Sequence, residues 1–222
     1  MNENRLKLND DKTEALLCGR KDILKNVDAH CLTFGSDTVE FSDHVKNLGV
    51  HIDSDLSMSI HVKNTIRSIY FELSRISKIR HLLPRKATES LVNSLVLTKL
   101  DYCNSLLANA SKYNLKSLQS IQNNAARLIL KKKKFEPSAP LLQELHWLPV
   151  EKRIIYKICT LVFKSLNSDG PLYLKDLITV YVPKRNLRSI HDTTLLLKPK
   201  IPRKIGEQSF LFSAPHFWNS LP

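Results

Sequence analysis

Lysine and arginine side chains recur on one side of the segment that follows residue 57, in a pattern that suits contacts with phosphate groups. The cations of this segment are Lys63, Arg67, Arg75 and Lys78. At about 100° of turn per residue they occupy an arc of roughly 120°, opposite an apolar arc of roughly 80°. The apolar residues are Val62, Ile66, Ile69, Leu73 and Ile76. The spacing therefore predicts a helix with a core-facing stripe and a basic face, and clustered cations attract phosphate backbones.

A second cationic group follows a helical pattern over residues 114–130. It is the run Lys131, Lys132, Lys133 and Lys134. Cations at a helix C-terminus interact favourably with the macrodipole, so a solvated helix end is one interpretation of this run. Contact with phosphates is the other, and both stay open at this point.

Charge is distributed unevenly along the 222 residues. Residues 1–57 contain seven Lys/Arg and eleven Asp/Glu, which gives a net charge of −4. Because the whole chain carries +13, the remaining residues carry +17. Such asymmetry suggests a small neutral-to-acidic part joined to a body that meets a polyanion. A solvated basic surface with no partner is the alternative.

The sequence lacks the usual signatures of nucleotide, metal or membrane binding. None of the five glycines lies in a phosphate-binding loop motif, and the eight histidines have no ligand spacing. The four cysteines are scattered, so neither a disulfide framework nor a zinc site is indicated, and we expect an intracellular, reduced protein. No apolar run approaches the roughly 20 residues that cross a bilayer, so we expect no membrane span.

Asp53 and Asp55 form the only D-x-D pattern that invites a metal-binding interpretation near a predicted helix start. An acidic residue just before a helical pattern is more often a cap, because its oxygens accept hydrogen bonds from the first backbone N–H groups. We therefore expect capping here and no metal site in this chain.

The predicted elements change character at residue 58. Before it we expect a strand over 13–18, a hairpin turning at 35–37 and a further strand over 45–52, in which Gly49 marks a bulge or a close backbone approach. After it, helical patterns cover 58–83, 84–106, 114–130, 140–147, 151–166 and 171–180. Residues 193–197 and 210–212 suggest short edge strands.

The expected fold class is α+β and helix-rich, with a small N-terminal antiparallel sheet, a helical bundle and a C-terminal segment with short strands. The domain boundaries expected from these patterns are 1–57, 58–135, 136–183 and 184–222, the last being a Pro-rich basic tail. A Pro-basic-basic phrase recurs at Pro84, Pro183 and Pro202. Without a fixed period it is interpreted as turn chemistry.

Seven phrases, in order, carry a family resemblance. They are LKLNDDKTEALLCG, VKNLGVHIDSDLS, KLDYCNSLLA, LQSIQNNAARLIL, LHWLPVEKRIIYKI, YVPKRNLRS and APHFWNSLP. Together they resemble the C-terminal part of reverse transcriptases from non-LTR (LINE-type) retrotransposons of the jockey and chicken-repeat-like clades. The resemblance covers nearly all of the chain.

The resemblance implies roles for individual residues. Lys12 falls in the palm segment after the catalytic Asp-Asp strand, where the family places a lysine proposed to protonate pyrophosphate. VKNLGV, with Leu48 and Gly49, resembles the primer-grip hairpin. The helices over 58–130 would be the thumb, which grips the template-primer duplex, and the rest resembles the C-terminal extension. The family's Mg²⁺-binding aspartates lie upstream of the matching segment, so we expect no bound cofactor and no complete catalytic site here.

Three hypotheses for function follow. The leading one is a truncated LINE-type reverse transcriptase fragment, in the nucleus or cytoplasm, that binds RNA, an RNA/DNA hybrid or DNA through basic helix faces without catalysing synthesis. The second is a helical protein-interaction or structural module with a solvated basic surface. The third is part of a split RNA-directed DNA polymerase whose aspartates come from another chain. The sequence leaves the oligomeric state open.

Overall fold

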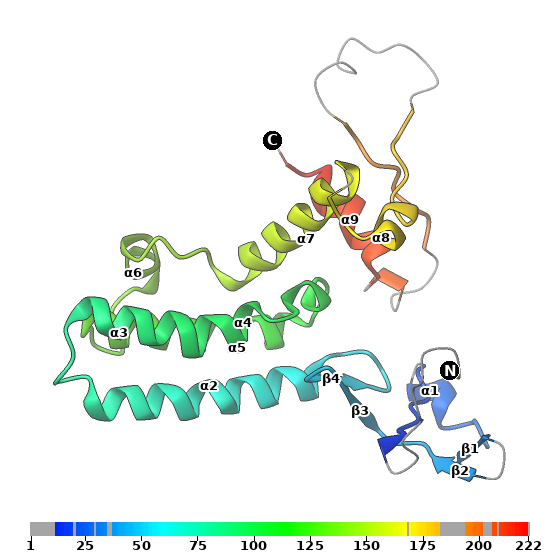
Figure 1. Ribbon diagram of the computed structural model, residues 1–222, viewed down its shortest axis with the longest axis horizontal. Coiled ribbons are helices and arrows are strands. Elements are labelled where there is room, and N and C mark those ends of the chain that lie inside the picture. The colour runs from blue at the N-terminus through cyan, green and yellow to red at the C-terminus, as the bar shows by residue number, and fades with distance from the viewer. Residues whose placement is uncertain are drawn as a thin grey trace, which may run out of the picture. The chain divides into compact units, whose positions relative to one another are not determined.

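Two β-hairpins followed by a series of helices make up the computed structural model of this chain (Figure 1). The structure describes residues 12–19, 21–28, 30–34, 37–167, 169–182, 194–201, 206–207 and 209–221. Backbone contacts divide the chain into two compact units, residues 1–63 and 64–222. The helix-rich α+β class expected from the sequence is confirmed. The four domain boundaries expected from it stay a prediction.

The first unit contains the short helix α1 (Lys21–Leu24) and two separate antiparallel hairpins. In the first, β1 (Cys31–Phe34) pairs with β2 (Asp37–Glu40), with Leu32 opposite Val39, as the alternation of apolar residues predicted. The strand expected over residues 13–18 is wrong, because only Ala15 forms a bridge, to Phe41. A strand needs a continuous partner, and within the described residues this segment has one bridging residue.

The second hairpin corrects another expectation. The single strand expected over 45–52 is two strands, β3 (His44–Asn47) and β4 (Val50–Asp53), with His44 opposite Asp53. The chain reverses at Leu48 and Gly49, whose φ angles are 46° and 84°. Two successive residues with positive φ fit the twist of a two-residue hairpin turn, so Gly49 is a turn residue and not a bulge.

Helix α2 (Ser59–Ile79) begins at the end of the first unit and continues into the second. Its start is held by Asp53, whose Oδ2 accepts hydrogen bonds from the Ser59 backbone N–H at 2.9 Å and the Ser57 hydroxyl at 2.7 Å. The expected capping is therefore confirmed, although the cap comes from six residues upstream. The intervening Leu56 and Met58 have positive φ angles of 56° and 58°.

A long, irregular helical segment follows Pro84. It consists of α3 (Arg85–Val92), the π-helical η3 (Asn93–Leu97) and α4 (Thr98–Asp101). The Thr98 hydroxyl donates to the Ser94 carbonyl at 2.5 Å, and the Ser94 hydroxyl donates to the Leu91 carbonyl at 3.2 Å. These bonds supply extra partners to carbonyls at the end of α3 and in the π-helical stretch, where the regular ladder is interrupted. The 3₁₀ turn η4 (Asn104–Leu107) comes next.

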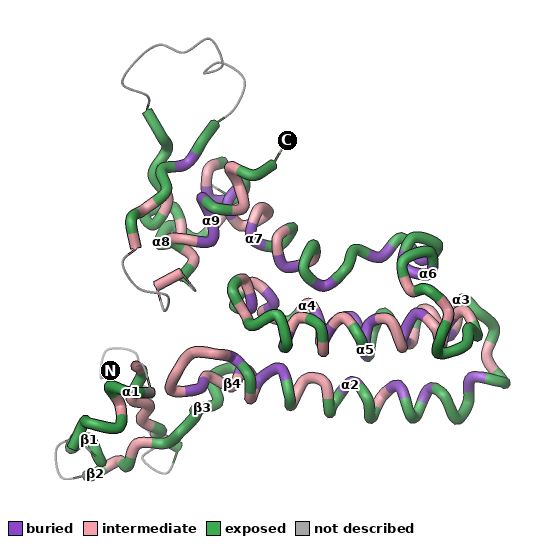
Figure 2. Tube along the Cα trace, turned by 180° about the vertical axis from the view of Figure 1, so that it is seen from behind, coloured by how far each residue is buried: buried purple, intermediate pink, exposed green. Residues whose placement is uncertain are grey.

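The remaining helices pack mainly through α5 and α7. Helix α5 (Lys112–Leu130) contacts α3, α6 (Ser138–Glu144) and α7 (Val150–Leu166), and α7 also contacts η4, α8 (Leu172–Asp176) and α9 (Phe210–Trp218). The fully buried side chains include Ile121 on α5 and Ile158 on α7. Figure 2 shows buried positions recurring along α2, α5 and α7. The core of the second unit is therefore built from amphipathic helices, as the apolar periodicity predicted.

The C-terminal strands were predicted less well. The strand expected over 193–197 is represented, among the described residues, by an antiparallel bridge between Val180 and Leu196. Residues 210–212 are not a strand but the first turn of α9. Ser213 and Ala214 are buried, and α9 packs against α7, so tertiary packing overrides the local strand propensity.

Candidate nucleic-acid interface

The basic face of α2 is exposed along its length. Lys63, Arg67, Arg75 and Lys78 are all exposed. On the opposite side Val62, Ile69, Leu73 and Ile76 are at most 7% exposed, and Ile66 is half-buried. Charge and core therefore lie on opposite sides of the helix, as predicted. Among the described residues, no ion pair engages Lys63, Arg67 or Lys78.

An aromatic ring lies within this basic face. Phe71 is four residues after Arg67 and four before Arg75, a spacing that places all three on one side of a helix. Its side chain is 63% exposed, and the Arg75 guanidinium carbon lies 5.6 Å from the ring centroid. Sequence analysis missed Phe71, although the same i, i+4 spacing would have found it. An exposed ring among cations can stack on a base or a sugar.

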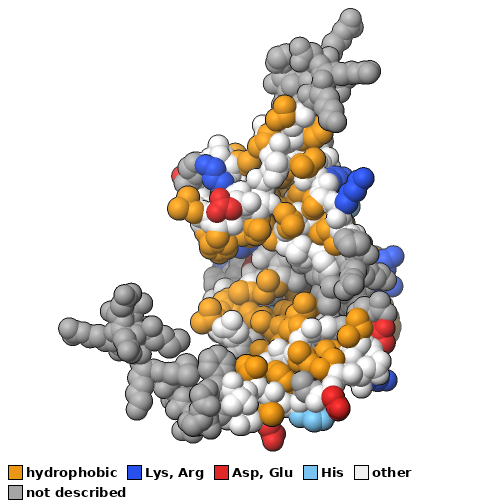
Figure 3. All heavy atoms as spheres, turned by 90° about the vertical axis from the view of Figure 1, so that its right-hand side faces the viewer, with side chains coloured by type: hydrophobic (Ala, Val, Ile, Leu, Met, Phe, Trp, Pro, Cys, Tyr) orange, Lys and Arg blue, Asp and Glu red, His pale blue; other side chains and the backbone are white. Residues whose placement is uncertain are grey.

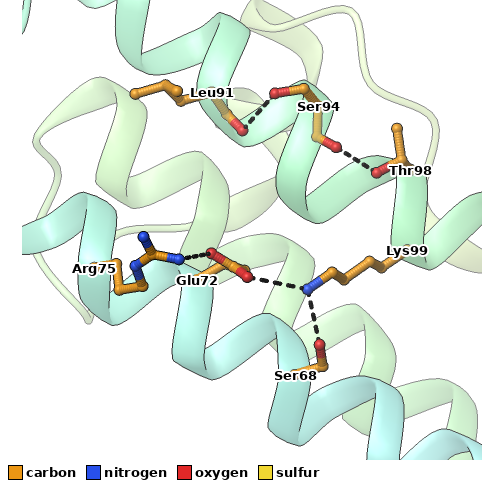
Figure 4. A network of polar contacts seen from close by, with 7 residues as sticks. All are labelled: Ser68, Glu72, Arg75, Leu91, Ser94, Thr98 and Lys99. Carbon is orange, nitrogen blue, oxygen red and sulfur yellow. Dashed lines mark hydrogen bonds and ion pairs between the residues drawn. The ribbon is translucent and has the colours of Figure 1, made fainter.

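Among the described residues, Arg75 is the member of the face that contacts a carboxylate (Figure 4). Its Nη1 lies 3.4 Å from Glu72 Oε2, while Glu72 Oε1 lies 3.3 Å from Lys99 Nζ. Lys99, on α4, also donates to the Ser68 hydroxyl at 2.8 Å. This network joins α2 to α4 and offsets part of the charge of Arg75. Lys63, Arg67 and Lys78 therefore carry most of the charge that the face presents.

The lysine run at the end of α5 is exposed at all four positions. Lys131 takes a left-handed conformation with a φ of 53°, which ends the helix. Lys132 Nζ lies 3.4 Å from Glu136 Oε2, and the Lys133 backbone N–H donates to Glu136 Oε1 at 3.0 Å. That backbone hydrogen bond, more than the neighbouring cations, lowers the pKa of the Glu136 carboxyl. One carboxylate thus partly neutralises the run, and Lys131, Lys133 and Lys134 have no ion pair among the described residues.

The carbonyl groups at the end of α5 are satisfied by a residue that sequence analysis did not single out. Arg80 is only 8% exposed. Its Nε donates to the Leu128 carbonyl at 2.9 Å, its Nη2 to the Ile129 carbonyl at 2.6 Å and its Nη1 to the Leu83 carbonyl at 2.8 Å. Arg80 therefore performs the C-terminal capping that was one interpretation of the lysine run.

The residues implied by the family resemblance lie in the first unit. Lys12 is exposed, and Leu48 and Gly49 form the exposed tip of the β3–β4 hairpin, with Leu48 86% exposed. A hairpin is therefore present where the resemblance places one. Next to it, the Lys46 backbone N–H donates to Glu14 Oε2 at 3.2 Å. The structure brings these residues into one unit and leaves their roles as predictions.

The described residues do not fit a two-metal centre. No group of three or more His, Cys, Asp or Glu side chains among them is arranged to hold a metal ion. The carboxylate that came closest to a metal motif in the sequence, Asp53, is occupied in capping α2. No step of any reaction is therefore assigned to Mg²⁺ in this chain.

Three further findings concern the cysteines, membrane-spanning helices and the comparison with known proteins. All four cysteines are free, and burial raises the pKa of the Cys159 thiol. In the part of the chain that the structure describes, every helix is too short or too polar to span a bilayer. Comparison with protein-family models, with curated proteins and with solved structures finds no match to this chain.

Proposed function

We propose that this chain binds RNA or an RNA/DNA hybrid through the basic face of α2, as a fragment related to LINE-type reverse transcriptases that does not by itself catalyse synthesis. The observation that carries the proposal is the exposure of Lys63, Arg67 and Lys78 on one helix face, without ion pairs among the described residues. Such a role would place the chain in the nucleus or cytoplasm.

The dimensions of the face support a phosphate backbone as its partner. Arg67 and Lys78 are eleven residues apart, so they span about 16 Å along the helix at 1.5 Å per residue. At 3.4 Å per nucleotide, one strand of a duplex covers this distance with about five nucleotides. Phe71 lies between the two cations and offers a stacking surface that is indifferent to base identity. We therefore expect weak sequence preference, because contacts to phosphates position a protein without reading bases.

Charge removal from the face tests the proposal. In the variant with Lys63, Arg67, Arg75 and Lys78 replaced by Ala, we expect the affinity for a fluorescein-labelled RNA/DNA hybrid to fall about tenfold or more at 100 mM salt. The slope of log affinity against log salt should become shallower by about 2 to 3, because Arg75 is already paired with Glu72 and counts for less than a full contact. Fluorescence anisotropy at several salt concentrations measures both quantities.

A matched control separates a specific face from net charge. Lys116, Lys152, Lys157 and Lys175 are exposed cations of the second unit that lie off this face. Replacing these four by Ala removes the same formal charge, and the slope should then stay close to the wild-type value. Equal losses in both quadruple variants would contradict a role for α2. Circular dichroism of each variant confirms that the helices remain folded.

The hypothesis of a split polymerase has its own test. With a poly(A) template, an oligo(dT) primer and Mg²⁺, we expect the isolated chain to incorporate no nucleotide, since no described carboxylate cluster can hold two metal ions. Incorporation that Lys12→Ala abolishes would instead favour the split-polymerase hypothesis.

A protein-interaction module is the second candidate, and exposed apolar side chains favour it. Figure 3 shows groups of apolar side chains exposed to the viewer. Exposed examples cluster in sequence on and after α8, at Leu172, Tyr173, Leu177, Val180, Tyr181 and Val182. Apolar surface of this kind usually marks an interaction site. A chain that does not bind hybrid at low salt but self-associates on analytical ultracentrifugation would support this candidate over nucleic-acid binding.

A further inference from the structure

A cavity of about 330 Å³ lies in the second unit between the end of α2, the start of α3 and the end of α5. Four cationic side chains line it, namely Arg80, Arg85, Lys131 and Lys132, against a single carboxylate, Glu144. Its walls bring together residues up to 64 positions apart in the sequence. The basic face of α2 ends at Lys78, two residues before the first of these cations.

The cations differ in how firmly they are held. The Arg80 guanidinium is fixed by its three bonds to carbonyl groups, which use three of its five N–H groups. The Arg85 Nη1 lies 2.6 Å from Glu144 Oε1, with both side chains about half exposed. Lys131 and Lys132 line the same cavity from the end of α5. The cavity therefore combines one preorganised buried cation with three cations that can move towards a ligand.

Backbone groups add to the positive potential. The first N–H groups of α3 have no acceptor within the helix, and the N-cap residue, Pro84, offers no side-chain acceptor. At the other side of the cavity, Arg80 compensates the carbonyl groups of Leu128 and Ile129. The negative end of α5 is thus neutralised, while the positive end of α3 is not.

We infer that this cavity, called here the α3–α5 pocket, binds a phosphate group of the nucleic-acid backbone that follows the α2 face. The inference rests on the proposed function and adds Arg80 and Arg85 to the residues that contact nucleic acid. An Arg fork and two ammonium groups offer more donors than a carboxylate ligand can accept. A phosphate group, with several acceptor oxygens in a tetrahedral arrangement, suits these donors better. Because Arg80 already caps α5, Lys131, which has no ion pair among the described residues, is available for this contact, and Lys132 can exchange its 3.4 Å pairing with Glu136 for it.

Charge changes of opposite sign inside the pocket provide the test. Arg85→Gln and Lys132→Gln should each weaken binding of the RNA/DNA hybrid about two- to fivefold at 100 mM salt. Each should reduce the salt slope by less than the about 0.7 to 0.9 of a full contact, because Arg85 is already paired with Glu144 and Lys132 with Glu136. Glu144→Gln should strengthen binding, because it removes the carboxylate and releases Arg85. A loss of folding cannot mimic that gain. Lys152→Gln, an exposed cation outside the pocket, should change the affinity less than twofold.

The outcomes separate this inference from the proposed function. Wild-type affinity in all three pocket variants would overturn the inference and leave the role of α2 intact. A wild-type chain that binds no hybrid would instead refute the proposed function. In that case, titration with inorganic phosphate, followed by ¹H–¹⁵N spectra, tests whether the pocket binds a phosphate group. Saturable shifts at the amides of Arg85 and Lys132 would support a phosphate site filled by a free anion. Their absence would overturn the site altogether.

Discussion

Replacing Arg80 by Met should destabilise the second unit far more than removing any exposed arginine. Arg80 is 8% exposed and donates to three backbone carbonyls at 2.6 to 2.9 Å, two of them at the end of α5. Met keeps most of the apolar stem and removes every donor, so the three carbonyl groups lose their partner. Arg80→Met therefore tests whether one side chain holds the turn after α2 against the end of α5.

The expected magnitude follows from those bonds. A hydrogen bond to a charged group contributes about 1.5–3 kcal/mol, which sets an upper limit near 4.5–9 kcal/mol for three. The adjoining pocket is open, so water can reach part of the exposed carbonyl surface, and burying the guanidinium itself costs free energy that Met does not. A loss of about 3 kcal/mol in the free energy of unfolding is therefore expected, equivalent to roughly 6–12 °C in Tm for a unit of this size.

Urea unfolding followed by tryptophan fluorescence measures this loss, because Trp147 and Trp218 both lie in the second unit. The denaturant slope should stay unchanged, which separates lost stability from a changed unfolded state. Arg75→Met is the matched control, since the Arg75 side chain is 66% exposed and its pairing with Glu72 contributes little. If Arg80→Met and Arg75→Met shift the urea midpoint equally, the capping role assigned to Arg80 is wrong.

The first unit offers two further predictions. Asp53→Ala should lower the stability of the first unit by about 1 kcal/mol, because the start of α2 loses its hydrogen-bond acceptor. Asp43→Ala, at an exposed position, should change that stability little. Hydrogen exchange of the first backbone amides of α2 measures the effect of each variant. Burial, together with the nearby His51, lowers the pKa of His61 below its ordinary value of 6.5, against a smaller opposing effect of Asp53. Between the folded pKa and pH 6.5 the unfolded chain therefore binds a proton at His61 that the folded chain does not bind. Stability that is present above pH 6.5 should be lost as the pH falls through the folded pKa. His61→Leu should flatten this pH dependence of the unfolding free energy, and an unchanged pH profile in that variant would contradict the role of His61.

Short-range patterns predicted the parts of the fold that depend on one element at a time. The apolar spacing of α2 placed Ile69 and Ile76 in the core and its cations in solvent, because a single buried stripe follows from helical geometry alone. The capping role of Asp53 was also predicted from local sequence, because a cap needs only an acceptor close to the helix start. The hairpin of β1 and β2 likewise followed from local alternation and turn residues.

Turn geometry and tertiary packing decided what the apolar pattern left ambiguous. Residues 45–52 alternate as one strand would, yet the chain reverses at Leu48 and Gly49, because both adopt positive φ. Phe210 begins a helix, although its apolar run suggested a strand, and this helix, α9, packs against α7. The free-energy difference between strand and helix that local propensity provides is too small to outweigh such packing.

The sequence by itself determined the charge asymmetry of this chain, the helical class of residues 58–166 and the two sides of α2. Only the tertiary structure decided that Glu72 pairs with Lys99 across 27 positions, and that Arg80 caps a helix end 48 and 49 positions away. It also decided that Arg85 and Lys132 line one cavity. The physical reason is that helical periodicity depends on neighbours in the chain, whereas the partner of a polar side chain depends on which distant backbone and carboxylate groups the packed helices bring within hydrogen-bonding distance.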